Sequence, residues 1–200
     1  VPHLEQAEEA IVSFGQGCEG EPLLQWRRIE QAIRTIRERT DKGVININSN
    51  ASNPRWLQRL YDAGLDTLRA STISGHPETY NAYYRPLGYT FEDVKESLKR
   101  ARDAGVYSSI NLLCFPGMID RDREVEALIA FVRETGLNLI QLRNLNIDPE
   151  VLLPKMPPLD SMGKALGIRT LVEMLHREVP EVAIGNFTRP IKRMNAVSKV

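Results

Sequence analysis

Residues 15–24 (GQGCEGEPLL) combine three glycines with two carboxylates, Glu19 and Glu21. Glycine lets the backbone adopt positive φ angles or approach a ligand closely. The two carboxylates could hold a ligand cation such as an ammonium group, and Pro22 suits the first turn of a following helix. A tight strand-to-helix turn with solvated acids explains the same residues equally well.

Three further side chains are candidates for binding substrate. Arg69 and Arg143 lie in predicted strands on the face that carries polar residues, where a guanidinium group could pair with a carboxylate or phosphate. Asn144 extends the same strand end. An ion pair with a neighbouring strand is an equally good explanation of the arginines. His76 follows a predicted strand, but Pro77 beside it indicates the start of a helix.

Several reaction classes have no support in the sequence. It contains no Ser-His-acid grouping at a recognisable elbow and no Gly-x-x-x-x-Gly-Lys phosphate loop. Its two cysteines, Cys18 and Cys114, give neither a disulfide framework nor a closed metal site. We therefore assign no metal ligand and leave the catalytic residues unknown.

The composition is that of one ordinary globular domain spanning residues 1–200. Apolar residues make up 42% of the chain, and 26 basic residues balance 26 acidic ones. A neutral chain has no net field to attract nucleic acid or an anionic membrane. The first residues lack a secretory signal, and no apolar run is long enough to cross a bilayer. We expect a soluble, cytoplasmic protein without a nucleic-acid or membrane partner.

Predicted strands and helices alternate along the chain, which indicates a parallel α/β sheet. Helical spacing of apolar residues is found in five segments: residues 29–36, 56–60, 91–101, 125–132 and 168–175. Gly43, Gly64, Gly105 and Gly136 are predicted just past helix ends. Strands are predicted at residues 10–14, 44–48, 66–71, 107–114, 137–143 and 181–184. Residues 148–160 are proline-rich and are either a lid or a connection to the last helix.

The strands alternate between apolar and polar residues, as Asn46 and Asn48 do among isoleucines. Helices can cover the apolar face, so the polar face must line a wet hollow. This predicts a TIM-like open partial barrel of about six parallel strands. An antiparallel sheet with one solvated face shows the same alternation, but the intervening helices favour parallel strands.

Three segments resemble motifs of the radical S-adenosylmethionine (SAM) enzymes. Residues 19–24 (EGEPLL) are similar to the Gly-Gly-Glu-Pro motif that ends the family's second strand, with Glu19 replacing the first glycine. Residues 71–80 (STISGHPETY) resemble its Ser-Leu-Asp-Gly segment and the Glu-Thr-Tyr that follows. Residues 110–120 (INLLCFPGMID) resemble the later strand that ends in a Pro-Gly-x-x-Asp turn. The likeness runs in register over about residues 8–145.

The resemblance implies where SAM binds. Gly20 and Glu21 would lie near its ammonium group, Ser71 near its ribose or carboxylate, and Asn111 near its ribose and adenine. The implied SAM-binding set is Glu19, Gly20, Glu21, Asn48, Ser71 and Asn111. The family fold, an open six-stranded partial barrel, agrees with the fold predicted from strand polarity.

One family feature is absent: the Cys-x-x-x-Cys-x-x-Cys motif, whose thiolates hold a [4Fe-4S] cluster that binds SAM. We expect this motif and the first strand to precede Val1, and expect no cluster in this chain. The resemblance implies that the intact enzyme cleaves SAM reductively and uses the 5'-deoxyadenosyl radical to take hydrogen from an unidentified small-molecule or peptide substrate. An electron donor such as flavodoxin or ferredoxin would reduce it.

Two other functions remain open at this stage. A barrel lyase or aldolase would use a metal or an inward lysine near a strand end, and the inward faces offer no lysine. A non-catalytic binding or scaffold module is natural if the chain is complete. An unpaired edge on the strand at residues 10–14 would favour a homodimer through that edge.

Overall fold

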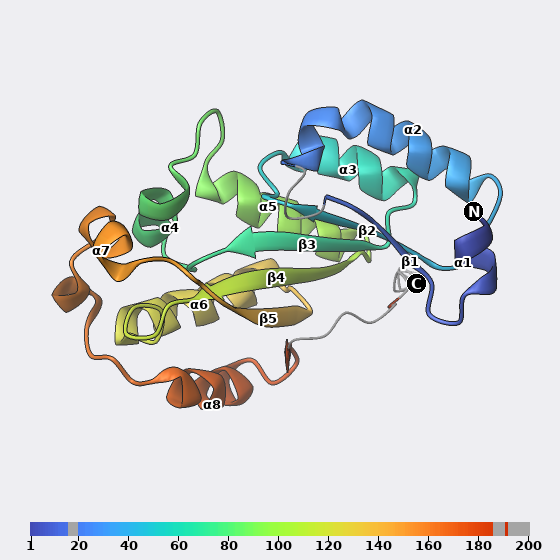
Figure 1. The fold of residues 1–200 in the computed structure, drawn as a ribbon. Helices are drawn as coiled ribbons and strands as arrows, with labels where there is room; N and C mark the ends of the chain where they lie inside the picture. The colour runs from blue at the N-terminus through green and yellow to red at the C-terminus, as the bar shows by residue number, and fades with distance from the viewer. Residues whose placement is uncertain (16–19, 186–190, 192–200) are drawn as a thin grey trace.

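The computed structural model describes residues 1–15, 20–185 and 191, and its centre is one sheet of six parallel strands. The strands are adjacent in the order of the sequence, so the sheet is open rather than closed (Figure 1). This confirms the predicted open α/β partial barrel. The strands are β1 (Ile11–Phe14), β2 (Val44–Ser49), β3 (Thr67–Thr72), β4 (Tyr107–Cys114), β5 (Leu139–Asn144) and β6 (Ala183–Gly185).

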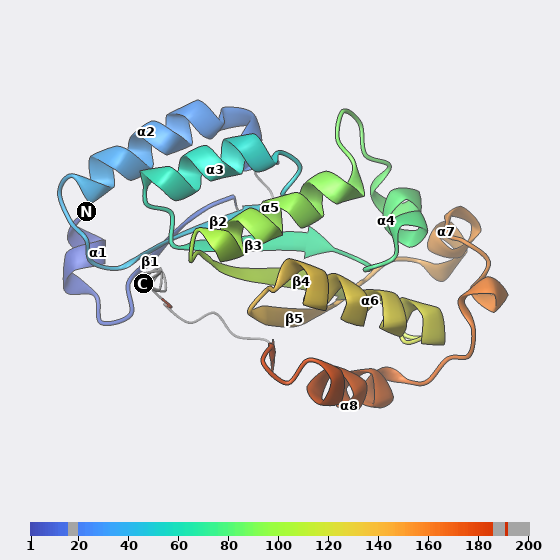
Figure 2. The ribbon, with the colours of Figure 1, turned by 180° about the vertical axis from the view of Figure 1, so that it is seen from behind.

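Five longer helices cover one face of the sheet, as the view from behind shows (Figure 2). Successive helices pack against one another around this outer face. All five were predicted: α2 (Trp26–Arg37), α3 (Pro54–Ala63), α5 (Phe91–Asp103), α6 (Asp122–Thr135) and α8 (Ile168–Glu178). In the part of the chain that the structure describes, no helix is long and apolar enough to span a bilayer.

The face of the sheet that lies under the helices is apolar. Ile45 and Ile47 of β2, Leu68 of β3, Ile110 of β4 and Ile140 of β5 are all 0% exposed and belong to one hydrophobic core. Burying such a side chain contributes about 1.5–3 kcal/mol. The apolar sides of the helices therefore pack against the apolar face of the sheet.

The opposite, concave face is polar, and the strand register arranges its side chains in rows. One row joins Asn48 of β2 to Arg69 of β3, and Arg69 to Ser109 of β4. The next joins Ser71 of β3 to Asn111 of β4. The predicted alternation is thus confirmed, because these side chains share one side of the sheet.

Several features differ from the sequence-based expectation. Helices α1 (Pro2–Gln6), α4 (Pro77–Tyr84) and α7 (Pro149–Leu152) were not assigned, although a helix start was indicated at Pro77. Gly43 was wrongly placed beside a helix end: α2 ends at Arg37. Gly43 has a φ of +66°, and a Cβ there would lie 3.2 Å from the Ala10 carbonyl oxygen, so its left-handed backbone conformation explains the glycine instead.

The segment at residues 148–160 packs against the body of the protein. It forms α7 and the short 3-10 helix η2 (Leu153–Lys155), and η3 (Leu159–Met162) overlaps its end. Leu152, Met156 and Met162 are buried, so their side chains anchor it. Buried and exposed residues alternate along the segment, which is typical of a connection to α8 that packs against the protein.

The loop from β3 to α4 is fixed to the first turn of α6. Glu124 is 3% exposed, and its carboxylate accepts hydrogen bonds from the hydroxyls of Ser74 and Thr79. Gly75 belongs to the same joint, because a Cβ there would lie 2.6 Å from the Ala127 carbonyl oxygen. The joint sets the position of the chain that follows Ser71.

We expect Glu124→Ala to lower the free energy of unfolding by about 2 kcal/mol or more, because it leaves two buried hydroxyls without their acceptor. Urea denaturation followed by circular dichroism measures this loss. The matched control is Glu126→Ala on the exposed face of the same helix, which should change stability by less than about 0.5 kcal/mol. Equal effects of the two substitutions would contradict the structural role of Glu124.

Candidate functional site

A cavity of about 410 Å³ lies at the carboxyl ends of β1–β4. This is the edge of a parallel sheet where loops converge and ligands bind. It brings together Gly20, Glu21, Asn48, Ser71 and Asn111, all of which the sequence assigned to SAM. Glu19 and Cys18 lie outside the described residues. The other lining residues are Gly15, Pro22, Ser49, Asn50, Arg69 and Tyr84.

Glu21 joins the loop after β1 to the end of β2. Its Oε1 accepts hydrogen bonds from the Leu23 backbone N–H (3.0 Å) and the Ser49 hydroxyl (2.7 Å), and its Oε2 accepts from the Asn50 N–H (2.7 Å). A carboxylate offers about four lone-pair positions. Three are used within the protein, and about one remains for a ligand cation.

Asn48 holds the start of the same loop. Its Nδ2 donates to the Gly15 carbonyl at 2.6 Å, and its Oδ1 accepts from Asn46 Nδ2 at 3.2 Å. The main chains also approach closely here: a Cβ on Gly15 would lie 2.5 Å from the Asn48 carbonyl oxygen and 2.9 Å from Pro22 Cγ. Asn48 therefore shapes the wall of the cavity through contacts to its neighbours.

Two buried polar atoms of uncharged lining residues have no hydrogen-bond partner among the described residues. They are Asn111 Oδ1, an acceptor, and the Tyr84 hydroxyl oxygen. Leaving such a group unsatisfied costs about 1–3 kcal/mol, so a bound ligand or water is expected to satisfy both. Asn111 was predicted, and Tyr84 was missed.

Tyr84 is fixed in place by an aromatic cluster. Its ring centroid lies 4.7 Å from that of Tyr80, which in turn lies 4.5 Å from Phe91. Burial raises the pKa of Tyr84 above its usual value, so its hydroxyl stays protonated. The four-residue spacing of Tyr80 and Tyr84 indicates a shared helix face, but only the fold shows that this face reaches the cavity.

The structure separates the three candidate substrate residues. Arg69 lines the cavity. Arg143 stands on the same concave face of β5, where it pairs in register with Leu113. Asn144 pairs with Cys114 and therefore lies on the other face, at the exposed end of β5. Burial and the neighbouring Arg143 charge lower the pKa of Arg69, because both disfavour its positive charge.

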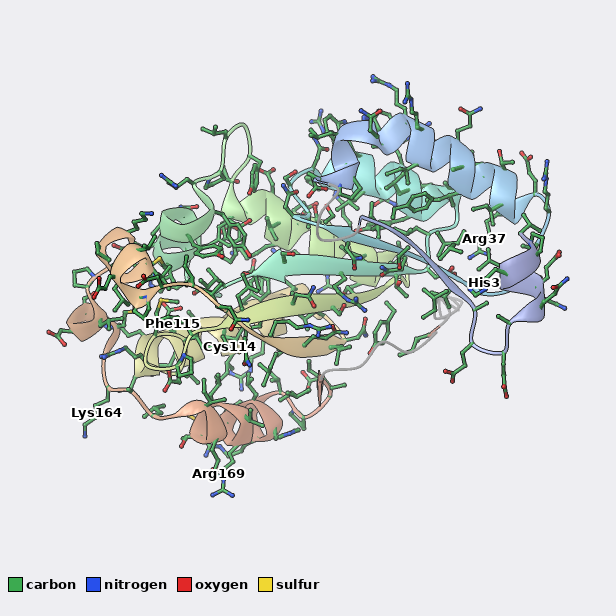
Figure 3. All side chains as sticks on the ribbon, in the orientation of Figure 1. His3, Arg37, Cys114, Phe115, Lys164 and Arg169 are labelled. Carbon is green, nitrogen blue, oxygen red and sulfur yellow. The ribbon has the colours of Figure 1, made fainter. Side chains whose placement is uncertain are left out.

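His76 and Cys114 lie away from the cavity. His76 precedes α4 and lines a separate hollow together with Glu78 and Arg123. Cys114, at the carboxyl end of β4, is a buried free thiol (Figure 3). Burial raises the pKa of its thiol, which disfavours the thiolate. The described residues contain no group of His, Cys, Asp or Glu able to hold a metal.

Comparison with known families agrees with this architecture. The profile of the Radical SAM superfamily matches residues 4–129, more than half of the chain. The chain belongs to the radical SAM superfamily. The resemblance inferred from the three motifs is thus confirmed. The match contains the loop after β1 and strands β2–β4, which carry most of the cavity wall.

A probable GTP 3',8-cyclase from Methanococcus maripaludis is 25% identical over 133 residues, which are 66% of this chain. This radical SAM chain spans only 43% of that relative's length. A domain of pyruvate-formate lyase-activating enzyme from Bacteroides vulgatus is 12% identical with a TM-score of 0.64, covering 89% of this chain and 99% of that domain.

A second solved structure, native anSMEcpe with bound AdoMet and a peptide, has a TM-score of 0.61 at 17% identity and covers 90% of this chain and 51% of its own. Methylornithine synthase (PylB) has a TM-score of 0.60 at 12% identity over 97% of this chain and 62% of its own. At these identities the likeness shows a shared fold.

We expect Gly15→Ala to destabilise the protein more than Gly20→Ala does. Both glycines have positive φ angles (+80° and +76°), so either alanine adds strain of about 1–2 kcal/mol. Only at position 15 would the new Cβ also overlap Asn48 and Pro22, whereas none of the described residues lies within 4 Å of it at position 20. Urea denaturation of both variants makes the comparison, and equal losses would contradict the close approach at Gly15.

Proposed function

We propose that this chain is the SAM-binding part of a radical SAM enzyme. The observation that carries the proposal is a polar cavity at the carboxyl ends of β1–β4 that contains two buried, unsatisfied polar atoms. Its volume of about 410 Å³ falls within the range of about 300–1,000 Å³ for small-molecule sites. Membership of the superfamily supports SAM as the ligand.

The chemistry of the cavity wall is complementary to SAM. The remaining lone pair of Glu21 suits an ammonium group, because a carboxylate is acceptor-only when ionised. Asn111 Oδ1 would accept a hydrogen bond from a ribose hydroxyl or the adenine amino group. The Tyr84 hydroxyl and the half-buried Ser71 provide donors for a carboxylate or ribose oxygen.

A [4Fe-4S] cluster does not fit this chain. Such a cluster needs three thiolates in the family's loop, and the chain has two cysteines, of which Cys114 is buried at the end of β4. We propose that residues encoded before Val1 supply the thiolates. The 43% coverage of the cyclase relative is consistent with further sequence in the intact protein.

SAM, when bound in the proposed enzyme, would be cleaved by one-electron reduction into methionine and a 5'-deoxyadenosyl radical, which would take a hydrogen atom from the substrate. The residues of this chain hold and orient SAM: Glu21 at the ammonium, Asn111 and Ser71 at the nucleoside, and Tyr84 on the helical side of the cavity. The protein contributes orientation and exclusion of water rather than the radical chemistry itself. An electron donor such as flavodoxin or ferredoxin is proposed as its partner.

We expect Asn111→Ala and Tyr84→Phe each to weaken SAM binding by about two- to tenfold, the effect of losing one hydrogen bond. Isothermal titration calorimetry on the full-length, cluster-loaded protein measures the affinity. The control is Tyr83→Phe, because Tyr83 contacts Tyr84 but lines a different cavity. If neither substitution weakens binding relative to this control, SAM does not contact the two unsatisfied atoms.

The full-length protein, reconstituted with iron and sulfide, should show the absorbance of a [4Fe-4S] cluster and release 5'-deoxyadenosine from SAM after reduction. Residues 1–200 alone should do neither, since two cysteines cannot replace three ligands. The measurements are ultraviolet–visible spectroscopy and chromatography of the nucleoside. A gene with no cluster-binding cysteines before the Val1 codon, or full-length protein that produces no deoxyadenosine, would refute the enzyme proposal.

A further inference from the structure

We propose that the substrate carries an anionic group, a carboxylate or a phosphate, and that this group binds Arg143 on the concave face of β5 beside the SAM cavity. The inference rests on the proposed function, because it takes the cavity at the ends of β1–β4 as the place of SAM. It adds the chemical class of the substrate and the residue that selects it.

The position of Arg143 suits a group that faces the substrate. It follows Gln141 by two residues on β5, and Gln141 stands in register with Asn111 of the cavity wall. The half-buried Arg143 side chain donates from Nη2 to Gln141 Oε1 at 3.1 Å. This contact holds one end of the guanidinium over the sheet and leaves its other N–H groups for a second partner.

The charge of Arg143 is not neutralised by the described part of the chain. Within residues 1–15, 20–185 and 191, Arg143 forms no ion pair, and its side chain donates a hydrogen bond to the neutral Gln141. The concave positions of all six strands carry no aspartate or glutamate in that same part of the chain. The sequence analysis considered an ion pair between Arg143 and a neighbouring strand. The described residues of the six strands do not form this ion pair.

Arg69 increases the positive charge next to Arg143. It lines the SAM cavity from β3, and burial together with the nearby Arg143 charge lowers the pKa of Arg69. Two guanidinium groups on one face repel each other, and an anion bound to Arg143 reduces that repulsion.

The strand next to β5 carries small residues on its side of the concave face. The cavity assigned to SAM is bounded by residues of β1–β4 and their loops, with Tyr84 of α4. On the side of β5 away from β4, the neighbouring strand is β6. There Gly185 pairs with Gln141, and the exposed Ala183 pairs with Leu139. Both positions in β6 have small residues, so no long side chain of β6 covers the concave face beside Arg143.

The experiment uses the full-length, cluster-loaded protein saturated with SAM, and the probes are inorganic phosphate and acetate at constant ionic strength. Calorimetry compares wild type with Arg143→Gln and Arg143→Lys. We expect Arg143→Gln to weaken binding of at least one probe by about tenfold or more, the effect of losing a hydrogen-bonded charge. Arg143→Lys should restore part of it, since lysine keeps the charge but not the fork of donors.

Arg169→Gln is the matched control. Arg169 lies on α8, and 93% of its side chain is exposed to solvent. Figure 3 shows this side chain pointing away from the sheet, whereas Cys114 is labelled at the carboxyl end of β4. This variant should bind both probes and SAM as the wild type does. The SAM affinity of Arg143→Gln is measured in the same titrations, and circular dichroism verifies that this variant is folded.

Three results would overturn the inference. Wild-type protein that binds neither probe would show that no anion site exists, and unchanged probe binding in Arg143→Gln would place the site elsewhere. Loss of SAM affinity in Arg143→Gln, with phosphate competing against SAM, would assign the arginine to the carboxylate of SAM itself. Failure of the proposed function is recognised separately, because wild-type protein would then neither bind SAM nor release deoxyadenosine.

Discussion

The structure depends on one constraint: each strand is apolar on one face and polar on the other. The isoleucines of β2 are buried under helices, while Asn46 and Asn48 between them face the hollow. Polar side chains in a closed, dry barrel would lack partners and destabilise it by about 1–3 kcal/mol for each unpaired group. The open sheet avoids this cost, because neighbouring side chains bond one another, as Thr67 Oγ1 does with Asn46 Oδ1 at 2.7 Å.

The same polar face organises the cavity through hydrogen bonds within the protein. The loop after β1 is held against the sheet by hydrogen bonds that Glu21 accepts from Ser49 and Asn50, and by one that Asn48 donates to the Gly15 carbonyl. On the other side, Glu124 fixes the chain between β3 and α4 to α6. A site whose walls are already held loses less conformational freedom when it binds, and this preorganisation favours affinity.

Electrostatics divides the concave face into two parts. The side near β1 carries Glu21, whose carboxylate is largely occupied by backbone and hydroxyl donors. The side near β5 carries Arg143, beside the arginine of β3. The two ends of this surface are therefore complementary to a cationic ammonium group and to an anionic group, respectively. This is the arrangement expected if a zwitterionic cofactor and an acidic substrate lie next to each other.

The sequence by itself determined the six strands, the five covering helices and the polarity of the two faces, because these follow from local periodicity that any short segment displays. It also placed Glu21, Asn48, Ser71 and Asn111 at strand ends that converge on one edge. Tertiary structure alone decided that Tyr84 reaches the cavity, that His76 does not, and that Asn144 turns to the other face. These outcomes depend on strand register and helix placement, which are set by contacts between residues far apart in the chain.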